Sequence, residues 1–160
     1  MANASATGTV ASNATSVSTI NTGTGARITV PIGAVPQTSS GGVGSVNFSI
    51  ENDTTSTYQV PTGVTQIGNL YRLGPSGTIF SQPVAVTLPV TGTHTQDELQ
   101  LYRVNPTTGA SEPYGGVYDS TEQTITTQTY EFSPWYVGWS MPDNMVSGCL
   151  NVDNTGSSIW

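Results

Sequence analysis

Residues 71–90 read YRLGPSGTIFSQPVAVTLPV and hold two short apolar runs on either side of a turn-forming segment. In the second run, Val84, Val86 and Leu88 alternate with smaller or hydroxylated residues, which is the period of a strand with one buried face. The glycines of the Gly-Pro-Ser-Gly segment supply the backbone conformations that turns require, and Pro83 suits the start of a strand. The stretch therefore predicts two strands and the connection between them.

Similar runs of β-branched and aromatic residues recur between residues 26 and 140, bounded by Gly, Pro and Asn. They read ARITVPI, VNFSIEN, TYQV, NLYRL, ELQLYRV, EPYGGVYD, QTITTQTYEF and WYVGW. No window of 11 or more residues has the 3.6-residue period of a helix. The pattern predicts an all-β fold, an antiparallel β-sandwich of about eight or nine strands. The hydroxyls on both faces of 124–129 favour an edge or solvent-facing strand there.

A chain of 160 residues is the size of one domain. Residues 1–25 are low in complexity and poor in apolar side chains, so we expect an extended N-terminal arm or one edge strand, with disorder as the alternative. Residues 26–140 then form the sandwich, and residues 141–160 form a C-terminal tail. We expect the arm to become ordered only against a partner.

The charge balance excludes several classes of partner. The chain has three Arg, no Lys and ten acidic residues, with a net charge of -7. Three cations are too few to neutralise a phosphate backbone, so nucleic acid is excluded, and anionic membrane surfaces are poor partners. No run reaches the roughly 18 apolar residues of a membrane span, so membrane insertion is not expected.

The residue types that hold metals and cofactors are also scarce. His94 is the single histidine and Cys149 the single cysteine, so neither a multi-His metal site nor an internal disulfide can be assembled. The acidic residues are scattered through turn-like segments and form no calcium-binding loop pattern. We expect no metal and no cofactor.

The composition is typical of extracellular proteins. Ser and Thr make up more than a quarter of the chain, and only 8% of residues are charged, against about 25% in ordinary globular proteins. Four Asn-x-Ser/Thr sequons are candidate glycosylation sites; they lie at Asn3, Asn13, Asn47 and Asn52. We therefore expect a location outside the cell or on its surface.

Four segments in order resemble the ZU-type domain of zona occludens scaffolds, netrin receptors and ankyrins, which also has relatives in bacterial and archaeal surface proteins. They are VPIGAVP, GPSGTIFSQPVAVTLP, LYRVNPTTGASEPY and YEFSPWYVG, and they span about residues 26–140. The resemblance implies a β-sandwich used for scaffolding, adhesion or domain coupling. It also implies that self-cleavage has to be considered, because certain members cleave themselves.

The cleaving members use the serine of a His-Phe-Ser motif to attack the preceding carbonyl, with the histidine as base. Here Phe132 and Ser133 match the scissile pair, whereas Glu131 occupies the histidine position and Pro134 follows the serine. We therefore regard Glu131, Phe132 and Ser133 as a vestigial site and expect the chain to stay intact.

The aromatic residues beside this motif allow two interpretations. Trp135, Tyr136 and Trp139 could form a platform for sugar rings, or they could fill the core. In a strand, Trp135, Val137 and Trp139 share one face. A chain with so few large apolar residues needs them inside, so we expect Val137 and Trp139 in the core and Tyr136 facing outward or at an edge.

These inferences converge on a non-enzymatic, extracellular structural or adhesive β-sandwich module. Its expected partners are other protein subunits or neighbouring domains, and one version is a self-assembling filament or surface subunit in which an extended segment adds a strand to a neighbour's edge. Two alternatives stay open. They are a carbohydrate-binding module with glycans as ligands, and a self-cleaving domain.

Overall fold

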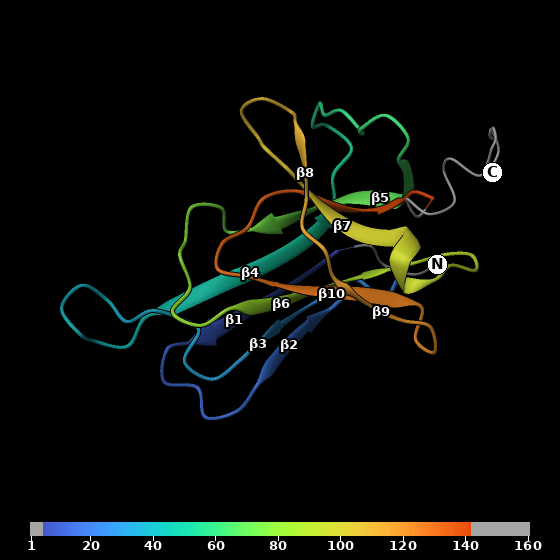
Figure 1. Cartoon of the computed structure of the whole chain (residues 1–160). Coiled ribbons are helices and arrows are strands. Elements are labelled where there is room, and N and C mark those ends of the chain that lie inside the picture. The colour runs from blue at the N-terminus through green and yellow to red at the C-terminus, as the bar shows by residue number, and fades with distance from the viewer. Residues whose placement is uncertain (1–4, 142–160) are drawn as a thin grey trace, which may run out of the picture.

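The computed structural model describes residues 5–141 and shows a β-sandwich made of two antiparallel sheets (Figure 1). The six-stranded sheet has the spatial order β1 (Ala6–Ala11), β4 (Ser45–Asn52), β5 (Thr65–Gly74), β11 (Trp135–Trp139), β7 (Leu99–Val104) and β8 (Ser111–Pro113). The five-stranded sheet has the order β2 (Ser18–Asn21), β3 (Arg27–Val30), β6 (Val84–Pro89), β10 (Thr124–Thr129) and β9 (Val117–Asp119). The all-β sandwich expected from the sequence is confirmed.

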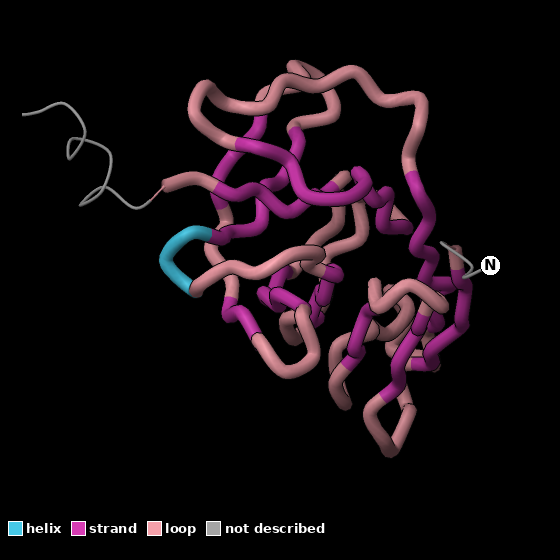
Figure 2. The backbone as a smooth tube through the Cα atoms, turned by 90° about the vertical axis from the view of Figure 1, so that its right-hand side faces the viewer, coloured by secondary structure: helices cyan, strands magenta, loops and turns pink. Residues whose placement is uncertain are grey.

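One short helical turn interrupts the strands. It is the 3₁₀ turn η1 (Gln96–Glu98), which leads directly into β7. Figure 2 shows it in cyan, and the other regular segments of residues 5–141 are extended.

The main core lies between the two sheets, where the inner faces of the strands meet. Val84, Val86 and Leu88, the alternating residues of β6, are all fully buried. Phe48 and Ile50 belong to the same cluster and come from β4 in the other sheet. Full burial of such a side chain contributes about 1.5–3 kcal/mol to the stability of the fold. Burial of these residues therefore largely decides which face of each strand points into the core.

A second apolar cluster covers the outer face of the six-stranded sheet. It contains Leu70, Tyr102, Val104 and Tyr136, and residues of the 53–64 connection, including Tyr58, pack over it. The expectation that Tyr136 faces outward or lies at an edge is therefore wrong, because that face is covered and Tyr136 is fully buried. The strand alternation itself holds, since Trp135 and Val137 belong to the main core.

The first 25 residues contain two edge strands. β1 pairs with β4 from Ala6↔Ile50 to Ala11↔Ser45, and β2 pairs with β3. Val10 and Ile20 are buried in the main core. The sandwich thus takes in residues 6–21 rather than beginning at residue 26. The expectation of an extended arm gives way to two strands that pair with β4 and β3 within the chain itself.

Close packing of β1 against β2 depends on a small residue. A Cβ atom at Gly8 would lie 2.9 Å from Ile20 Cγ1, a distance that real Cβ contacts do not reach. Glycine at this position lets the two edge strands lie together, although they belong to different sheets.

Within residues 5–141 the strands number eleven rather than eight or nine, because β1 and β2 are additional and residues 111–119 divide into two. Gly115 and Gly116 have φ angles of +67° and +127° and carry the chain from β8 in one sheet to β9 in the other. One local expectation is also wrong, since the TYQV run at 57–60 lies in a connection rather than a strand. Of the two alternatives for 124–129, the edge strand is wrong, because β10 lies between β6 and β9, whereas a solvent-facing strand agrees with the exposed Gln128.

Candidate functional site

The connection from β10 to β11, residues 130–134, holds the sequence motif that suggested chemistry. Hydrogen bonds fix its backbone at both ends, because the Phe80 amide donates to the Tyr130 carbonyl at 2.8 Å and the Val104 amide donates to the Pro134 carbonyl at 2.9 Å. Within it, the Thr129 hydroxyl donates to the Glu131 carbonyl at 2.7 Å. The connection is therefore a firmly held bend.

Phe132 anchors this bend in the core. Its ring centroid lies 5.0 Å from that of Phe80 and 6.0 Å from that of Phe48, both with edge-on geometry. Phe48 and Phe80 are themselves stacked at 5.5 Å. The three phenylalanines of the chain thus form one cluster, and Phe132 has a packing role that accounts for its position without any reaction.

Ser133 is the polar residue left without a partner at this bend. Its Oγ is buried and makes no hydrogen bond within residues 5–141. Two hollows of about 300 and 240 Å³ adjoin it, and both are also lined by Phe132, Ser76 and Pro106. A serine hydroxyl beside a hollow could act as a nucleophile only if a base lay within hydrogen-bond reach of it.

Glu131 is not placed as that base. Its carboxylate lies 3.8 Å from a guanidinium nitrogen of Arg103, and its side chain is 46% exposed to solvent. Arg103 also pairs with Glu112 at 3.4 Å and lies 5.5 Å from the centroid of the Tyr114 ring. The glutamate is thus part of a surface ion-pair network.

The single histidine lies at the other end of β11. The His94 ring is 5.9 Å from the ring of Trp139, the last residue of that strand, whereas Ser133 precedes its first residue. Glu98 completes this corner by accepting hydrogen bonds from Trp139 Nε1 at 2.6 Å and from the Thr95 hydroxyl and amide at 2.8 Å. These bonds, the one from Trp139 first, lower the pKa of Glu98.

A buried carboxylate organises the loop of Ser56, a residue that lines the hollow of about 300 Å³. Asp53 accepts hydrogen bonds from the backbone amides of Thr55 and Ser56 at 2.9 and 3.0 Å, and from the Ser56 hydroxyl at 2.5 Å. A guanidinium nitrogen of Arg72 lies 3.1 Å from it. Burial by itself raises the pKa of Asp53, but the bonds from Ser56 and Thr55 and the charge of Arg72 outweigh it and lower the pKa to about 2.

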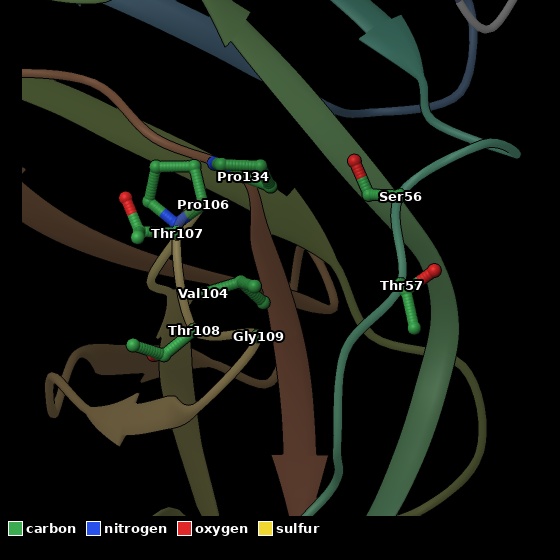
Figure 3. Close-up of a pocket in the computed structure, with 8 residues that line it drawn as sticks. All are labelled: Ser56, Thr57, Val104, Pro106, Thr107, Thr108, Gly109 and Pro134. Atoms are coloured by element: carbon green, nitrogen blue, oxygen red, sulfur yellow. The ribbon is translucent and has the colours of Figure 1, made fainter.

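A further hollow, of about 470 Å³, lies between the Asp53 loop and the turn after β7. Figure 3 shows Ser56 and Thr57 along one side of it and the Pro106–Gly109 turn along the other, with Val104 and Pro134 between them. The lining is made of hydroxyls, proline rings and backbone. No Asp, Glu, His, Lys, Cys or Tyr is among the residues that line it.

The sugar-platform residues are not available to a sugar. Trp135 and Tyr136 are fully buried, Trp135 in edge-on contact with Tyr114 at 4.7 Å and Tyr136 stacked on Tyr102 at 5.3 Å. Trp139 is only partly buried and packs against the main core. It is therefore less buried than the core position expected for it. One partly covered ring does not make a platform.

The remaining candidate residues are on the surface or outside the described chain. Asn13, Asn47 and Asn52 are exposed, and Asn47 accepts a hydrogen bond from Thr9 at 3.3 Å. Asn3, Cys149 and the tail from 142 onward lie outside the described residues. Within residues 5–141, no three His, Cys, Asp or Glu side chains come together as metal ligands would. In the same range no helix has the length and apolar content needed to cross a bilayer.

Asp53 and Pro106 were not singled out from the sequence as site residues. Asp53 begins the segment DTTS. The side chain of an Asp in a turn often accepts a hydrogen bond from the backbone amide two residues on, so the sequence could have predicted this loop. Pro106 gave no such signal. It faces the hollows only because β7 and the β10–β11 connection are brought together by the fold.

Comparison with known families gives one match, in which the ZU5 domain family matches residues 6–105 of the chain. The matched region begins at β1, so it includes both N-terminal edge strands and runs to the end of β7. A comparison with proteins of curated function gives no match.

Proposed function

The chain belongs to the ZU5 domain family, whose members are protein-interaction modules, and we propose that it is a non-enzymatic structural or adhesive module working outside the cell. Its partners would be other protein subunits or neighbouring domains. A filament or surface-layer subunit is the version of this role in which the partner is another copy. In either version the chain would be a relative of the ZU5 domains in prokaryotic or viral surface proteins.

The observation that carries the proposal is the contrast between the two sides of the sandwich. On one side the edges are β8 and β9, which are three residues each and include Glu112, Pro113 and Asp119. Short strands, charges and proline are the features that keep an edge from pairing with another chain. That side is protected.

The other side lacks these features. β1 is six residues long and β2 is four, and neither contains a charged residue or a proline. Within the described chain, β1 pairs only with β4 and β2 only with β3. Because lysine is a common edge-protecting residue and the chain has none, this side is open to strand addition by a partner.

Contact through β1 can be tested with a photo-crosslinking amino acid at Thr7, which is exposed on this edge strand. The matched control is the same amino acid at Gln128, which is exposed on β10 inside the five-stranded sheet. We expect covalent adducts to another protein in the source organism from position 7 and few from position 128. Equal yields, or adducts from neither position, would count against the edge as the contact.

The extracellular location needs a separate test. Antibodies raised against the domain should label intact cells or particles of the source as strongly as permeabilised ones. Labelling that requires permeabilisation would overturn the extracellular part and leave the interaction role standing.

A further inference from the structure

We propose that the end of the sandwich formed by the β1–β2, β3–β4, β5–β6 and β10–β11 connections is a contact surface through which two copies of this chain pair end to end. In Figure 1 these connections lie on the left of the molecule. The inference deepens the proposed function, because it assumes that the chain works by protein contacts and names one partner and one surface.

This apolar end carries five of the large hydrophobic side chains that are exposed in the described chain. Their exposed fractions lie between 53% and 60%; they are Val17, Ile32, Val43, Ile79 and Tyr130. Such side chains are ordinary when scattered singly, but grouped on one surface they indicate an interaction site.

Backbone hydrogen bonds show that the loops carrying these side chains are neighbours at this end. The Ser12 backbone amide donates to the Gly44 carbonyl at 2.8 Å, and this bond joins the loops of Val17 and Val43. The Ser81 backbone amide donates to the Ala34 carbonyl at 2.8 Å and joins the loops of Ile32 and Ile79. The Phe80–Tyr130 bond extends the surface to the β10–β11 connection. These backbone bonds hold the loops in place, so little order has to be gained on binding.

Charge favours a second copy as the occupant. Each chain has a net charge of -7, so two copies repel one another over most of their surfaces. The loops at 12–17, 31–44 and 75–83 contain no charged residue, and Glu131 is the one acid in the fourth connection. This end is therefore where two copies meet with the least electrostatic cost. The four connections offer no cation to an anionic membrane, and Arg72, which lines the hollow beside Phe132, is paired with Glu51 and Asp53.

Shape favours the same occupant. The hollow of about 300 Å³ beside Phe132 and Pro134 is lined in part by Ser76, on the same connection as the projecting Ile79. Projecting and receiving apolar surfaces thus occur on one end, as a two-fold symmetric pairing requires. The five side chains offer an area on the order of 500 Å² per copy, below the roughly 800 Å² of a stable interface, so the dimer is weak and concentration-dependent.

The test is sedimentation velocity on the full chain, from low micromolar to about 1 mM protein. We expect the wild type to move from monomer toward dimer over this range. Ile79→Ser, or independently Ile32→Ser, should weaken dimerisation about tenfold or more, since a two-fold interface loses the contact twice. Val117→Ser is the matched control. Val117 is 72% exposed but lies on β9, outside the apolar end, and its loss should leave the dimer unchanged.

Salt gives a second readout. Added salt screens the repulsion between two chains of charge -7, so it should strengthen the dimer. A dimer held together by opposite charges would instead become weaker as salt is added. Unchanged thermal unfolding of each serine variant shows that the fold is retained.

A wild type that stays monomeric up to the highest concentration overturns the proposal, as does an equal effect of Val117→Ser. So does co-sedimentation with phosphatidylcholine vesicles that Ile79→Ser abolishes, which would make a lipid surface the occupant. A monomer that still forms crosslinks to another protein from position 7 leaves the proposed function in place, so the two failures are distinguishable.

Discussion

Asp53 is the residue at which buried charge and loop structure are most directly linked. Its carboxylate holds the backbone of residues 55 and 56 and faces Arg72, and its pKa is lowered from 3.8 to about 2. A folded-state pKa below the unfolded value means that the ionised group stabilises the fold above about pH 4, and that this contribution is lost as the pH falls toward 2.

We expect the free energy of unfolding to fall by about 2 kcal/mol between about pH 5 and pH 2 through Asp53 alone. Urea denaturation at a series of pH values measures it. Asp53→Asn should be less stable at neutral pH and should lose less stability on acidification. Part of the acid dependence should persist, because Glu98 also has a lowered pKa. Parallel curves for the wild type and the variant would contradict this assignment.

The Ser133 hydroxyl lies beside two hollows but has no base next to it. Glu131 pairs with Arg103 and His94 lies at the far end of β11, so no described group is placed to take the hydroxyl proton. We expect denaturing mass spectrometry to show one species near 16.7 kDa for both the wild type and Ser133→Ala. Two fragments divided between residues 132 and 133, present in the wild type and absent from the variant, would establish cleavage.

At the scale of the element, β11 shows how one strand serves two cores. It lies between β5 and β7 in the middle of the six-stranded sheet, so both of its faces are covered. Trp135 and Val137 fill the space between the sheets, while Tyr136 fills the cluster under the 53–64 connection and donates a hydrogen bond to Ser111 at 2.7 Å. The strand β11 therefore contributes side chains to both apolar clusters.

This arrangement predicts unequal costs along the strand. Trp135→Ala should destabilise the protein by about 3–5 kcal/mol, because the ring is fully buried and leaves a cavity. Trp139→Ala should lower the free energy of unfolding clearly less, because the ring is already partly exposed. This variant loses mainly the contact of one side of the ring with the core and the hydrogen bond to Glu98. Urea denaturation of the two variants makes the comparison. Equal losses would mean that Trp139 is buried as deeply as Trp135.

At the scale of the whole molecule, the N-terminal segment is a part of the sandwich. β1 and β2 each complete one sheet, and their buried residues Val10 and Ile20 belong to the main core. Their hydroxylated sequence gives little apolar surface, so the stability of this region comes from the ladders with β4 and β3 as well as from burial.

Elastase, which cleaves after small residues such as those of β1, should spare residues 6–21 in the monomer as well as in any assembly. A chain lacking residues 1–25 should lose cooperative unfolding, because both sheets would be left with new edges and an uncovered core. If elastase removes residues 6–21 from a monomer and the remainder keeps its β-sheet signal, this result would contradict the placement of the segment in the sandwich.

The sequence by itself determined the class of the fold and much of its inner face. Alternation in β6 and in β11 depends only on the two-residue period of a strand, so the pattern of residues was enough to assign Val84, Val86, Leu88 and Val137 to the core. The absence of lysine, the single histidine and the acidic balance also excluded whole classes of chemistry from composition alone.

Only the tertiary structure decided which segments cover the faces that alternation leaves outward. Tyr136 is buried because residues 53–64, distant in sequence, fold over its sheet. β1 is a strand because β4 supplies a ladder for it, whereas its polar sequence left an arm, an edge strand and disorder open. The same holds for the hollows beside Ser133 and for the apolar end, which assemble from loops joined by backbone bonds. Local pattern fixes which side of a strand is apolar, but the partner of each side depends on long-range pairing, and backbone bonds carry no sequence signal.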